Sequence, residues 1–430
     1  MNPVYMILTG ILAVLILALP RPYAAVPFLI CTLYVTWDQM IVIAGQHCNS
    51  CFILVIFGAL RLMFRNEFYP RETDRITLLI MLWAITDLVT DFFLNGLSGD
   101  TVRIRTVFTV VGLYLYFKSV IRNYDDILTV LKLLPLLVAP IALSMIMEYF
   151  TGHNLFGQLG GVPDQSAIRY GKVRCQGPFS HPILAGTFGA TIMPAIVALW
   201  FQPTVKKSWC ILGAVASLII TVTAGSSGAL TTFILETLGF ACWYSRYRMH
   251  WIRRSLAAIV IVLAVSMKAP IWYLIARLSD LSGHGTGWHR ARLLDVAFGQ
   301  YFHEWWLIGT KYTRHWMPYG LAEYKTKTDV TNQYLGDGID GGIFLMALFI
   351  LIIVCCFSAL GKALRRNESA PLSRRLLLWA LGVTLFGHAV SFMSVSYFDQ
   401  SAIWFYLLIG SIGAVSALPL VATPEGAGAP

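Results

Sequence analysis

The sequence predicts an all-α protein, a polytopic bundle of transmembrane helices, chiefly because of its composition. Of the 430 residues, 57% are apolar and 13% are charged, whereas soluble domains average roughly 45–50% and ~25%. The mean hydropathy is +0.67. A helical span needs ~20 mostly apolar residues, so 12 or 13 spans would use nearly all the apolar residues. This composition excludes a soluble enzyme, a disordered chain and a coiled coil.

Apolar segments follow one another along most of the chain. The first, Val4 to Pro20, has neither a basic region before it nor an A-x-A site, so we expect a retained helix and not a cleaved signal. Segment 52–64 is short enough to be tilted, re-entrant or merged with its neighbour, which leaves 12 or 13 spans. The predicted spans are 4–20, 24–44, 52–64, 76–95, 105–120, 126–150, 183–201, 208–224, 228–245, 255–276, 340–360, 375–395 and 401–420.

Basic residues in three connections predict the orientation, because Lys and Arg mark cytoplasmic loops. Alternation from these connections places 151–182 and 277–338 outside and the carboxy terminus in the cytoplasm. The amino terminus is outside with 13 spans and inside with 12. The net charge of +10 then reflects topology and anionic lipid, not nucleic acid. The basic residues are Lys206, Lys207, Arg246, Arg248, Arg253, Arg254, Lys362, Arg365, Arg366, Arg374 and Arg375.

The second outer loop has about 60 residues, and structureless loops of this length tend to be functional. Its run from Trp288 to Trp306 has helix-like apolar spacing, which predicts an amphipathic helix on the outer interface, anchored by Trp. Four parts of the chain are therefore expected: transmembrane helices with an outer loop at 151–182 (1–276), the large outer loop (277–338), carboxy-terminal transmembrane helices (339–420) and a flexible tail (421–430).

The outer loop at 151–182 gathers basic side chains beside a Gly-Pro turn that directs them back to the membrane surface. A guanidinium binds phosphate through a planar fork and Lys adds a point charge, which favours phosphate binding by Arg174. For Arg169 and Lys172 the alternative is a topology or lipid-headgroup patch. His181, just before the next span, either caps that helix or joins the site.

The long loop opens with His289, Arg290 and Arg292. Arg290 and Leu294 lie one helical turn apart and share a face. Leu294 would enter the interface while Arg290 stays at phosphate level. The alternative is a solvated basic helix face.

The long loop closes with carboxylates and amides at the mouth of the next span, including Asp329, Asn332, Asp337 and Asp340. Polar groups at that depth are costly unless used or paired. Asp329 or Asp337 could act as a general base if burial raised its pKa, and Asn332 is expected to join the site. Asp340 is interpreted as a helix cap.

Polar residues inside or near the predicted spans are site candidates or interhelical partners, with Arg103 and Arg105 as counter-charges. The turn Thr223–Gly228 is interpreted as structural. Cys48-x-x-Cys51 lacks the second pair of a zinc site. Motifs of ATP-driven pumps, metalloproteases and serine hydrolases are missing, as is a D-x-D pair for a metal. The polar residues are Asp38, Gln39, Asp87, Asp91, Glu148, His388, Asp399 and Gln400.

Three motifs occur in order on the predicted outer face: Arg174-x-x-Gly177-x-Phe179-x-His181-Pro182, Arg290-x-x-x-Leu294, and Thr331-Asn332 followed by nine residues and Gly342. Together they resemble the O-antigen ligase and O-antigen polymerase superfamily, bacterial inner-membrane glycosyltransferases of the GT-C type with a large periplasmic loop. The family's signature histidine is Thr331 here, and threonine cannot be a base near neutral pH. The base would then be Asp329 or a loop histidine, His289 or His303. The departure also favours a polymerase-like or divergent branch over a lipid A-core ligase.

The resemblance implies a periplasmic site that moves a glycan from undecaprenyl pyrophosphate to a hydroxyl of a glycan or lipid acceptor. Arginines would stabilise the leaving pyrophosphate electrostatically, so no metal or other cofactor is implied. Membrane lipids are expected partners and nucleic acid is not. The implied pyrophosphate-binding residues are Lys172, Arg174, His181, Arg290 and Arg292, and the implied catalytic residues are His289, Asp329 and Asn332.

Two other functions stay open. The intramembrane acids favour a transporter of lipid-linked glycans or a proton-coupled carrier, although no inverted repeats are visible. Thr331 favours a non-catalytic component of a polysaccharide assembly complex.

Overall fold

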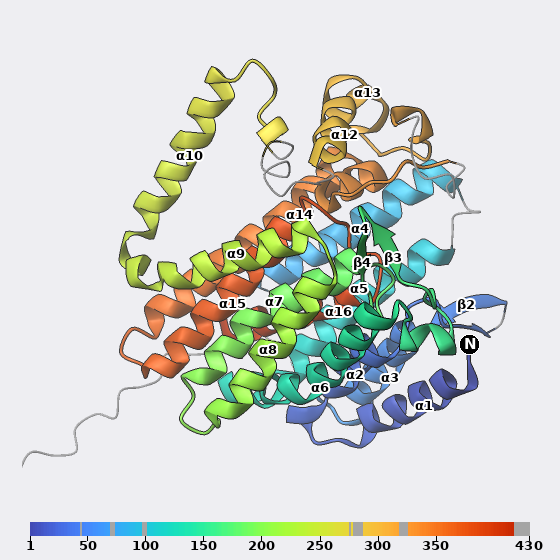
Figure 1. Ribbon diagram of the computed structural model, residues 1–430, viewed down its shortest axis with the longest axis vertical. Coiled ribbons are helices and arrows are strands. Elements are labelled where there is room, and N and C mark those ends of the chain that lie inside the picture. Colours follow the sequence, from blue (N-terminus) through green and yellow to red (C-terminus); the bar gives the residue numbers. More distant parts are fainter. Residues whose placement is uncertain are drawn as a thin grey trace, which may run out of the picture.

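The computed structural model is a mostly helical bundle (Figure 1). It describes residues 1–43, 45–68, 74–96, 101–274, 277, 287–317 and 326–416, so the predicted tail 421–430 lies outside the described residues. Among the described helices, five are long and apolar enough to cross a membrane: Arg75–Asn95, Tyr124–Thr151, Pro182–Trp200, Ser227–Ser266 and Gln333–Arg366. This is fewer than the 12 or 13 predicted spans. Four predicted segments form apolar helices of only 10–17 residues, and the predicted spans 228–245 and 255–276 both fall in the continuous helical stretch Ser227–Ser266, which comprises α9, η4 and α10.

The described part of residues 1–174 contains six helices of eight residues or more, and the side chains of Asn2, Asn49, Asp74 and Asn123 cap four of their starts. Its elements are α1 (Pro3–Ala18), η1 (Arg21–Tyr23), α2 (Val26–Tyr34), β1 (Met40–Ile43), β2 (Gln46–Asn49), α3 (Ser50–Phe64), α4 (Arg75–Asn95), α5 (Thr101–Val120), α6 (Tyr124–Thr151), η3 (Leu155–Leu159), β3 (Ala167–Arg169) and β4 (Lys172–Arg174).

The remaining elements form the centre of the bundle and the structured part of the long loop. They are α7 (Pro182–Trp200), α8 (Lys207–Thr223), α9 (Ser227–Ala241), η4 (Cys242–Arg248), α10 (Met249–Ser266), α12 (Gly287–Gly299), α13 (Phe302–Trp305), η5 (Arg314–Trp316), α14 (Gln333–Arg366), α15 (Leu372–Ser391) and α16 (Ser401–Ser416).

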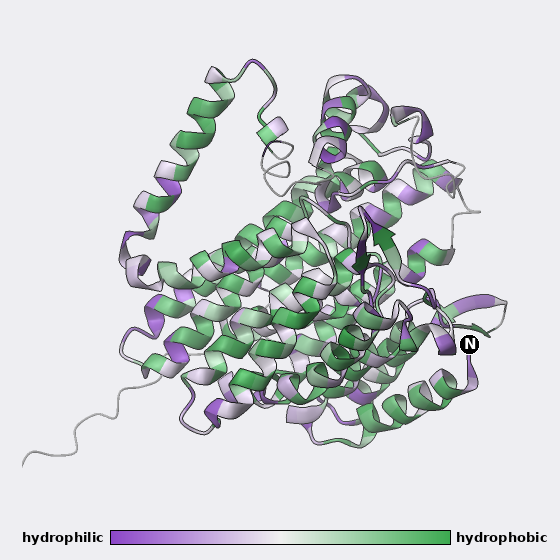
Figure 2. Cartoon of the chain, in the orientation of Figure 1, coloured by the Kyte–Doolittle hydropathy of each residue, from purple (hydrophilic) through white to green (hydrophobic). Residues whose placement is uncertain are grey.

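The helix α7 lies at the centre, packed against α6, α8, α9 and α15, and most of its residues are buried. Apolar side chains cover the outside of the bundle as well, and hydrophilic residues gather toward its ends (Figure 2). By contrast, α10 has no buried residue and stands apart from the bundle in Figure 1. An apolar outer surface of this kind suits lipid as the surrounding medium.

The predicted span 24–44 is wrong. Only Val26–Tyr34 is helical, and the chain then forms the antiparallel hairpin of β1 and β2. Asp38 is therefore an exposed residue between two elements instead of an intramembrane acid. The Gln39 side chain accepts from the Asn2 N–H at 2.7 Å, which gives it a structural partner.

The long loop packs as a small core of its own on the beginning of α14. Leu293, Trp305 and Trp316 are buried in this core with Leu335 of α14. The prediction that Trp side chains of the run Trp288–Trp306 anchor an interfacial helix is therefore wrong for Trp305. Trp288 and Trp306 are 60% and 44% exposed.

A break in α14 holds the loop in place. Gly342 has φ +78°, a conformation that favours glycine, and a Cβ there would lie 2.3 Å from the Leu307 carbonyl oxygen. The Ile343 N–H donates to the Trp306 carbonyl at 2.8 Å, and the Thr310 N–H donates to the Ile339 carbonyl at 2.8 Å. The backbone groups freed by the break are thus satisfied by the loop.

The connections of the bundle lie at two ends. The hairpins β1–β2 and β3–β4 and the helices α12 and α13 lie at the right and upper right of Figure 1. The α7–α8, α9–α10 and α14–α15 connections, which carry the three basic clusters, lie at the opposite end. We call the end with the hairpins and α12 the loop end.

Candidate functional site

The hairpin β3–β4 places Arg174 at the loop end. Tyr170 and Gly171 both have positive φ, as a tight two-residue hairpin turn requires. Beyond β4, the Cys175 N–H donates to the Thr223 carbonyl at 3.0 Å, which joins the strand to the end of α8. Arg174 is thereby fixed against the bundle and is only 7% exposed.

Two carboxylates anchor the loop that follows Arg174. Glu148, at the end of α6, accepts from the Gln176 and Gly177 N–H groups at 3.0 and 2.9 Å. Asp399, between α15 and α16, accepts from the Ser180 N–H at 3.0 Å. Glu148 therefore anchors this loop, and these hydrogen bonds set the position of the loop relative to Arg174.

Arg290 reaches the same place from α12. It faces inward with Leu293 and is 6% exposed. A Cβ at Gly228 would lie 3.7 Å from Nη2 of Arg290, and a Cβ at Gly225 would lie 3.1 Å from Cγ of Arg174. The α8–α9 turn, which sequence reasoning treated as purely structural, thus lies against both arginines.

The two guanidinium groups lack a close protein counter-ion in the described part of the chain. Neither forms an ion pair or a hydrogen bond there, and the Nε atoms of Arg174 and Arg290 are buried without a hydrogen-bond acceptor. Buried donors are almost always satisfied in folded proteins, and a buried charge without a partner is costly. This pair, which we call the arginine pair, is therefore a candidate anion site.

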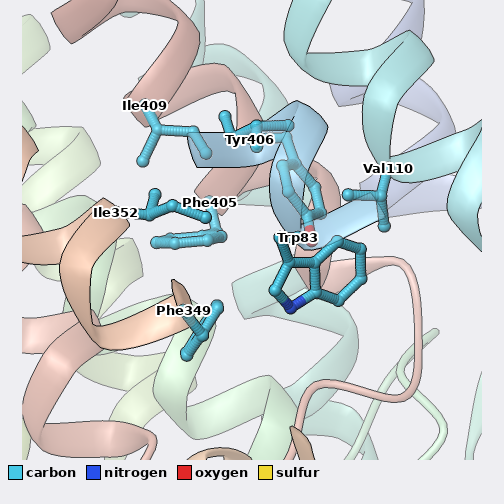
Figure 3. A pocket seen from close by; sticks show the side chains of 8 residues that line it. Trp83, Val110, Phe349, Ile352, Phe405, Tyr406 and Ile409 are labelled. Atoms are coloured by element: carbon cyan, nitrogen blue, oxygen red, sulfur yellow. The ribbon is translucent and has the colours of Figure 1, made fainter. Parts of the chain in front are cut away.

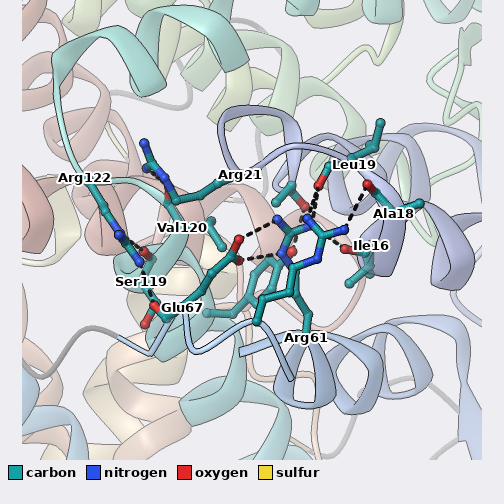
Figure 4. Close-up of polar contacts among 12 residues, drawn as sticks. Ile16, Ala18, Leu19, Arg21, Arg61, Glu67, Ser119, Val120 and Arg122 are labelled. Atoms are coloured by element: carbon teal, nitrogen blue, oxygen red, sulfur yellow. Dashed lines mark hydrogen bonds and ion pairs between the residues drawn. The ribbon is translucent and has the colours of Figure 1, made fainter. Parts of the chain in front are cut away.

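Arg61 shows how the same fold treats a buried structural arginine (Figure 4). Its side chain is fully buried, as those of the arginine pair nearly are, but it donates to both Glu67 carboxylate oxygens at 2.7 and 2.9 Å. It also donates to the Leu19 carbonyl at 2.8 Å. Unlike Arg61, neither arginine of the pair has an acceptor for its buried Nε, which is why the pair is the candidate anion site.

Burial and nearby positive charge strengthen this interpretation. The pKa of Arg290 is lowered to about 10, chiefly by burial; the positive charges of Arg169 and Arg174 act in the same direction, and Asp329 opposes them. Burial also lowers the pKa of Arg174, with Arg169 acting in the same direction. Both side chains stay charged near neutral pH, so the site presents an excess of positive charge that a bound anion would neutralise.

Asp329 and His289 lie beside the arginine pair. Burial raises the pKa of Asp329, while His289 and Arg290 pull it down. His289 Nε2 and the Thr331 hydroxyl are buried without a hydrogen-bond partner. The site therefore combines excess positive charge with a carboxyl group that can hold a proton nearer to neutral pH than an exposed Asp.

Several predicted site residues have other partners. Asn332 caps α14 by accepting from the Leu335 N–H at 2.9 Å. Arg292 pairs with Asp295 at 2.9 Å and does not join the arginine pair. Lys172 is exposed on β4. His181 caps α7 by accepting from the Ile183 N–H, and burial, Arg174 and Arg169 lower its pKa to about 4, so it is neutral near pH 7.

The predicted intramembrane pairing is found for Asp87. Its partner Arg103 lies 3.2 Å from Asp87 and 3.1 Å from Asp340, linking α4, α5 and α14. The interpretation of Asp340 as a helix cap is wrong, because Asp340 lies inside α14, which Asn332 caps. Sequence reasoning did not identify Glu236, a buried carboxyl on α9 packed against Gly387. Among the described residues, no three His, Cys, Asp or Glu side chains form a cluster that could hold a metal ion.

Comparison with known proteins gives no family for this chain. No protein-family model matches it, and no curated protein matches it.

Proposed function

We propose that the protein is a metal-independent glycosyltransferase of the bacterial inner membrane that uses undecaprenyl pyrophosphate-linked glycan on its periplasmic face. The observation that carries this proposal is the arginine pair: two arginines only 7% and 6% exposed, each with a buried Nε that has no acceptor, beside an Asp of raised pKa. A pyrophosphate supplies the missing negative charge, and guanidinium groups bind its oxygens with directed, charge-assisted hydrogen bonds.

The chemistry follows from these groups. An acceptor hydroxyl attacks the anomeric carbon of the donor glycan, a new C–O bond forms, and the bond from that carbon to the pyrophosphate oxygen breaks. The bonding electrons leave with the pyrophosphate, whose developing charge Arg174 and Arg290 stabilise. Asp329 takes the proton of the acceptor hydroxyl, since burial raises its pKa toward the working pH. His289, whose Nε2 has no partner, is the rival base.

The membrane topology belongs to the same proposal. With the basic connections at one end of the bundle and the arginine pair at the other, the positive-inside rule assigns the loop end to the periplasm. The shorter apolar helices α1, α3, α8 and α16 would then complete a polytopic bundle.

The test is release of undecaprenyl pyrophosphate by the purified protein in proteoliposomes supplied with lipid-linked glycans extracted from a host strain lacking the protein. The wild-type chain should release it with growth of the glycan product, and Arg290→Ala should not. Arg292→Ala, on the same helix but paired with Asp295, is the matched control and should stay active. Binding without release would indicate a scaffold, and movement of intact donor across the bilayer a transporter.

A further inference from the structure

A cavity distinct from the arginine pair lies near the loop end, between α3, α4, α5, α14 and α16. Its volume is about 610 Å³, within the ~300–1,000 Å³ typical of small-molecule sites. Trp83, Val110, Phe349 and Tyr406 line both this cavity and a small apolar recess, whose lining side chains Figure 3 shows. The recess has only about 10 Å³, room for no more than one water, so it admits no lipid tail.

The charge of this cavity is opposite to that of the arginine pair. Its ionisable lining includes the carboxylates of Asp87, Asp337, Asp340 and Asp399 but only two guanidinium groups, those of Arg103 and Arg105. Arg103 is already held between Asp87 and Asp340. This excess of carboxylates opposes phosphate and other anions, and favours a ligand that donates hydrogen bonds.

Asp87 points to that kind of ligand. It is 1% exposed and lines the cavity, yet neither carboxylate oxygen accepts a hydrogen bond. Its nearest counter-charge, Nη2 of Arg103, lies 3.2 Å away. Asp337, by contrast, accepts from Trp83 Nε1 at 2.9 Å and from Gln333 Nε2 at 3.1 Å. The cavity thus contains one buried carboxylate still short of donors.

Aromatic side chains supply the rest of the wall. Trp37, Trp83, Tyr397, Phe398 and Tyr406 line the cavity together with the amides Asn49 and Gln333. Flat aromatic faces bury the apolar C–H face of a sugar ring, while carboxylates and amides accept from and donate to its hydroxyls.

We propose that this cavity binds a neutral saccharide. The inference rests on the proposed function in that the saccharide would belong to the glycan donor or to the acceptor. Gln333 connects this cavity with the site at the arginine pair. Its side-chain amide lines the cavity, donates to Asp337 and accepts from the Tyr397 N–H through Oε1. In the sequence, Gln333 directly follows the Asp329–Asn332 segment. Asp399 lines the cavity and also anchors the loop that carries Arg174.

The experiment is saturation-transfer NMR on the full chain in nanodiscs with lactose, cellobiose, chitobiose and their monosaccharides. At least one should bind, and Thr106→Trp, which places an indole on the cavity wall, should weaken binding at least tenfold. Asp87→Asn, which keeps the shape, is the second variant and should weaken it as well. Ile104→Trp is the matched control, because Ile104 is 58% exposed on the same helix and does not line the cavity.

Two further probes separate this proposal from the function proposed above. Inorganic pyrophosphate should bind independently of Thr106→Trp and lose binding in Arg290→Ala, so a failure at the arginine pair leaves the saccharide result standing. Displacement of the saccharide by lipid-linked glycan would assign the cavity to the donor, and its retention would assign it to the acceptor. The proposal is overturned if no saccharide binds, if binding ignores both cavity variants, or if spermidine alone binds there.

Discussion

Replacing Arg290 by Met separates a ligand-binding arginine from a structural one, because the two roles predict opposite changes in stability. Methionine keeps an unbranched apolar stem and removes the charge. In the unliganded protein that charge is unfavourable, since burial and the neighbouring arginines lower the pKa of Arg290 from 12.5 to about 10. At about 1.4 kcal/mol per pKa unit, this corresponds to about 3 kcal/mol at pH 7, where the group is charged both folded and unfolded.

We therefore expect Arg290→Met to raise the apparent Tm of the unliganded protein while turnover falls on the order of 10²–10³-fold, the usual loss for one electrostatic donor. The Tm increase that undecaprenyl pyrophosphate gives the wild-type chain should disappear. Arg290→Lys should restore turnover only in part, because an ammonium lacks the planar fork.

Two matched variants complete the assay, which is thermal unfolding in nanodiscs alongside glycan transfer. Arg61→Met should lower the Tm, because it leaves Glu67, whose side chain is only 12% exposed, without its partner; breaking a buried pair typically costs about 3–5 kcal/mol. Arg292→Met should change neither Tm nor turnover. A fall in Tm with normal turnover in Arg290→Met would refute the reasoning, since Arg290 would then be a structural residue.

The remaining predictions concern the base, the topology and the metal. Asp329→Asn should lose turnover but keep donor binding. In the wild type the rate should rise with pH as the Asp329 carboxyl, whose pKa burial raises, loses its proton. A normal rate in Asp329→Asn together with an inactive His289→Ala would assign the base to His289 on α12. Thr331→His should be tolerated, and growth of the glycan product by that variant is the check. Single cysteines at the exposed Gln158 and His303, in a cysteine-free background, should label with an impermeant thiol reagent in intact spheroplasts; labelling only after lysis would contradict the topology. Transfer should survive EDTA, and loss of activity that Mg²⁺ or Mn²⁺ restores would count against arginine-only stabilisation of the leaving group.

The apolar helices could be predicted closely because their ends are marked in the sequence. The predicted segment 76–95 corresponds to Arg75–Asn95, which Asp74 caps, and 183–201 corresponds to Pro182–Trp200, which begins at a proline. The segment 24–44 failed because an apolar run alone does not distinguish helix from strand. Its last residues, Met40–Ile43, are mostly β-branched and precede a glycine with positive φ, and they form a hairpin strand.

The site could be predicted only in part. Arg174, Arg290, His289 and Asp329 were identified as polar residues on one predicted face, and the structure brings them together. The pairing of Arg292 with Asp295 could have been predicted from their i,i+3 spacing on a helix.

The α8–α9 turn was not identifiable from its sequence. Its glycines touch Arg174 and Arg290 only because a hairpin and a distant helix pack on them. The acid-lined cavity likewise combines residues from 37 to 406, whose proximity no local pattern encodes.

The most direct test of the central claim is a cryo-EM structure of the protein in nanodiscs with undecaprenyl pyrophosphate. The account predicts density for the two phosphates between the guanidinium groups of Arg174 and Arg290, with Asp329 beside the bound group. Pyrophosphate density at the opposite end of the bundle, among the basic residues of the α7–α8 or α14–α15 connections, would contradict it.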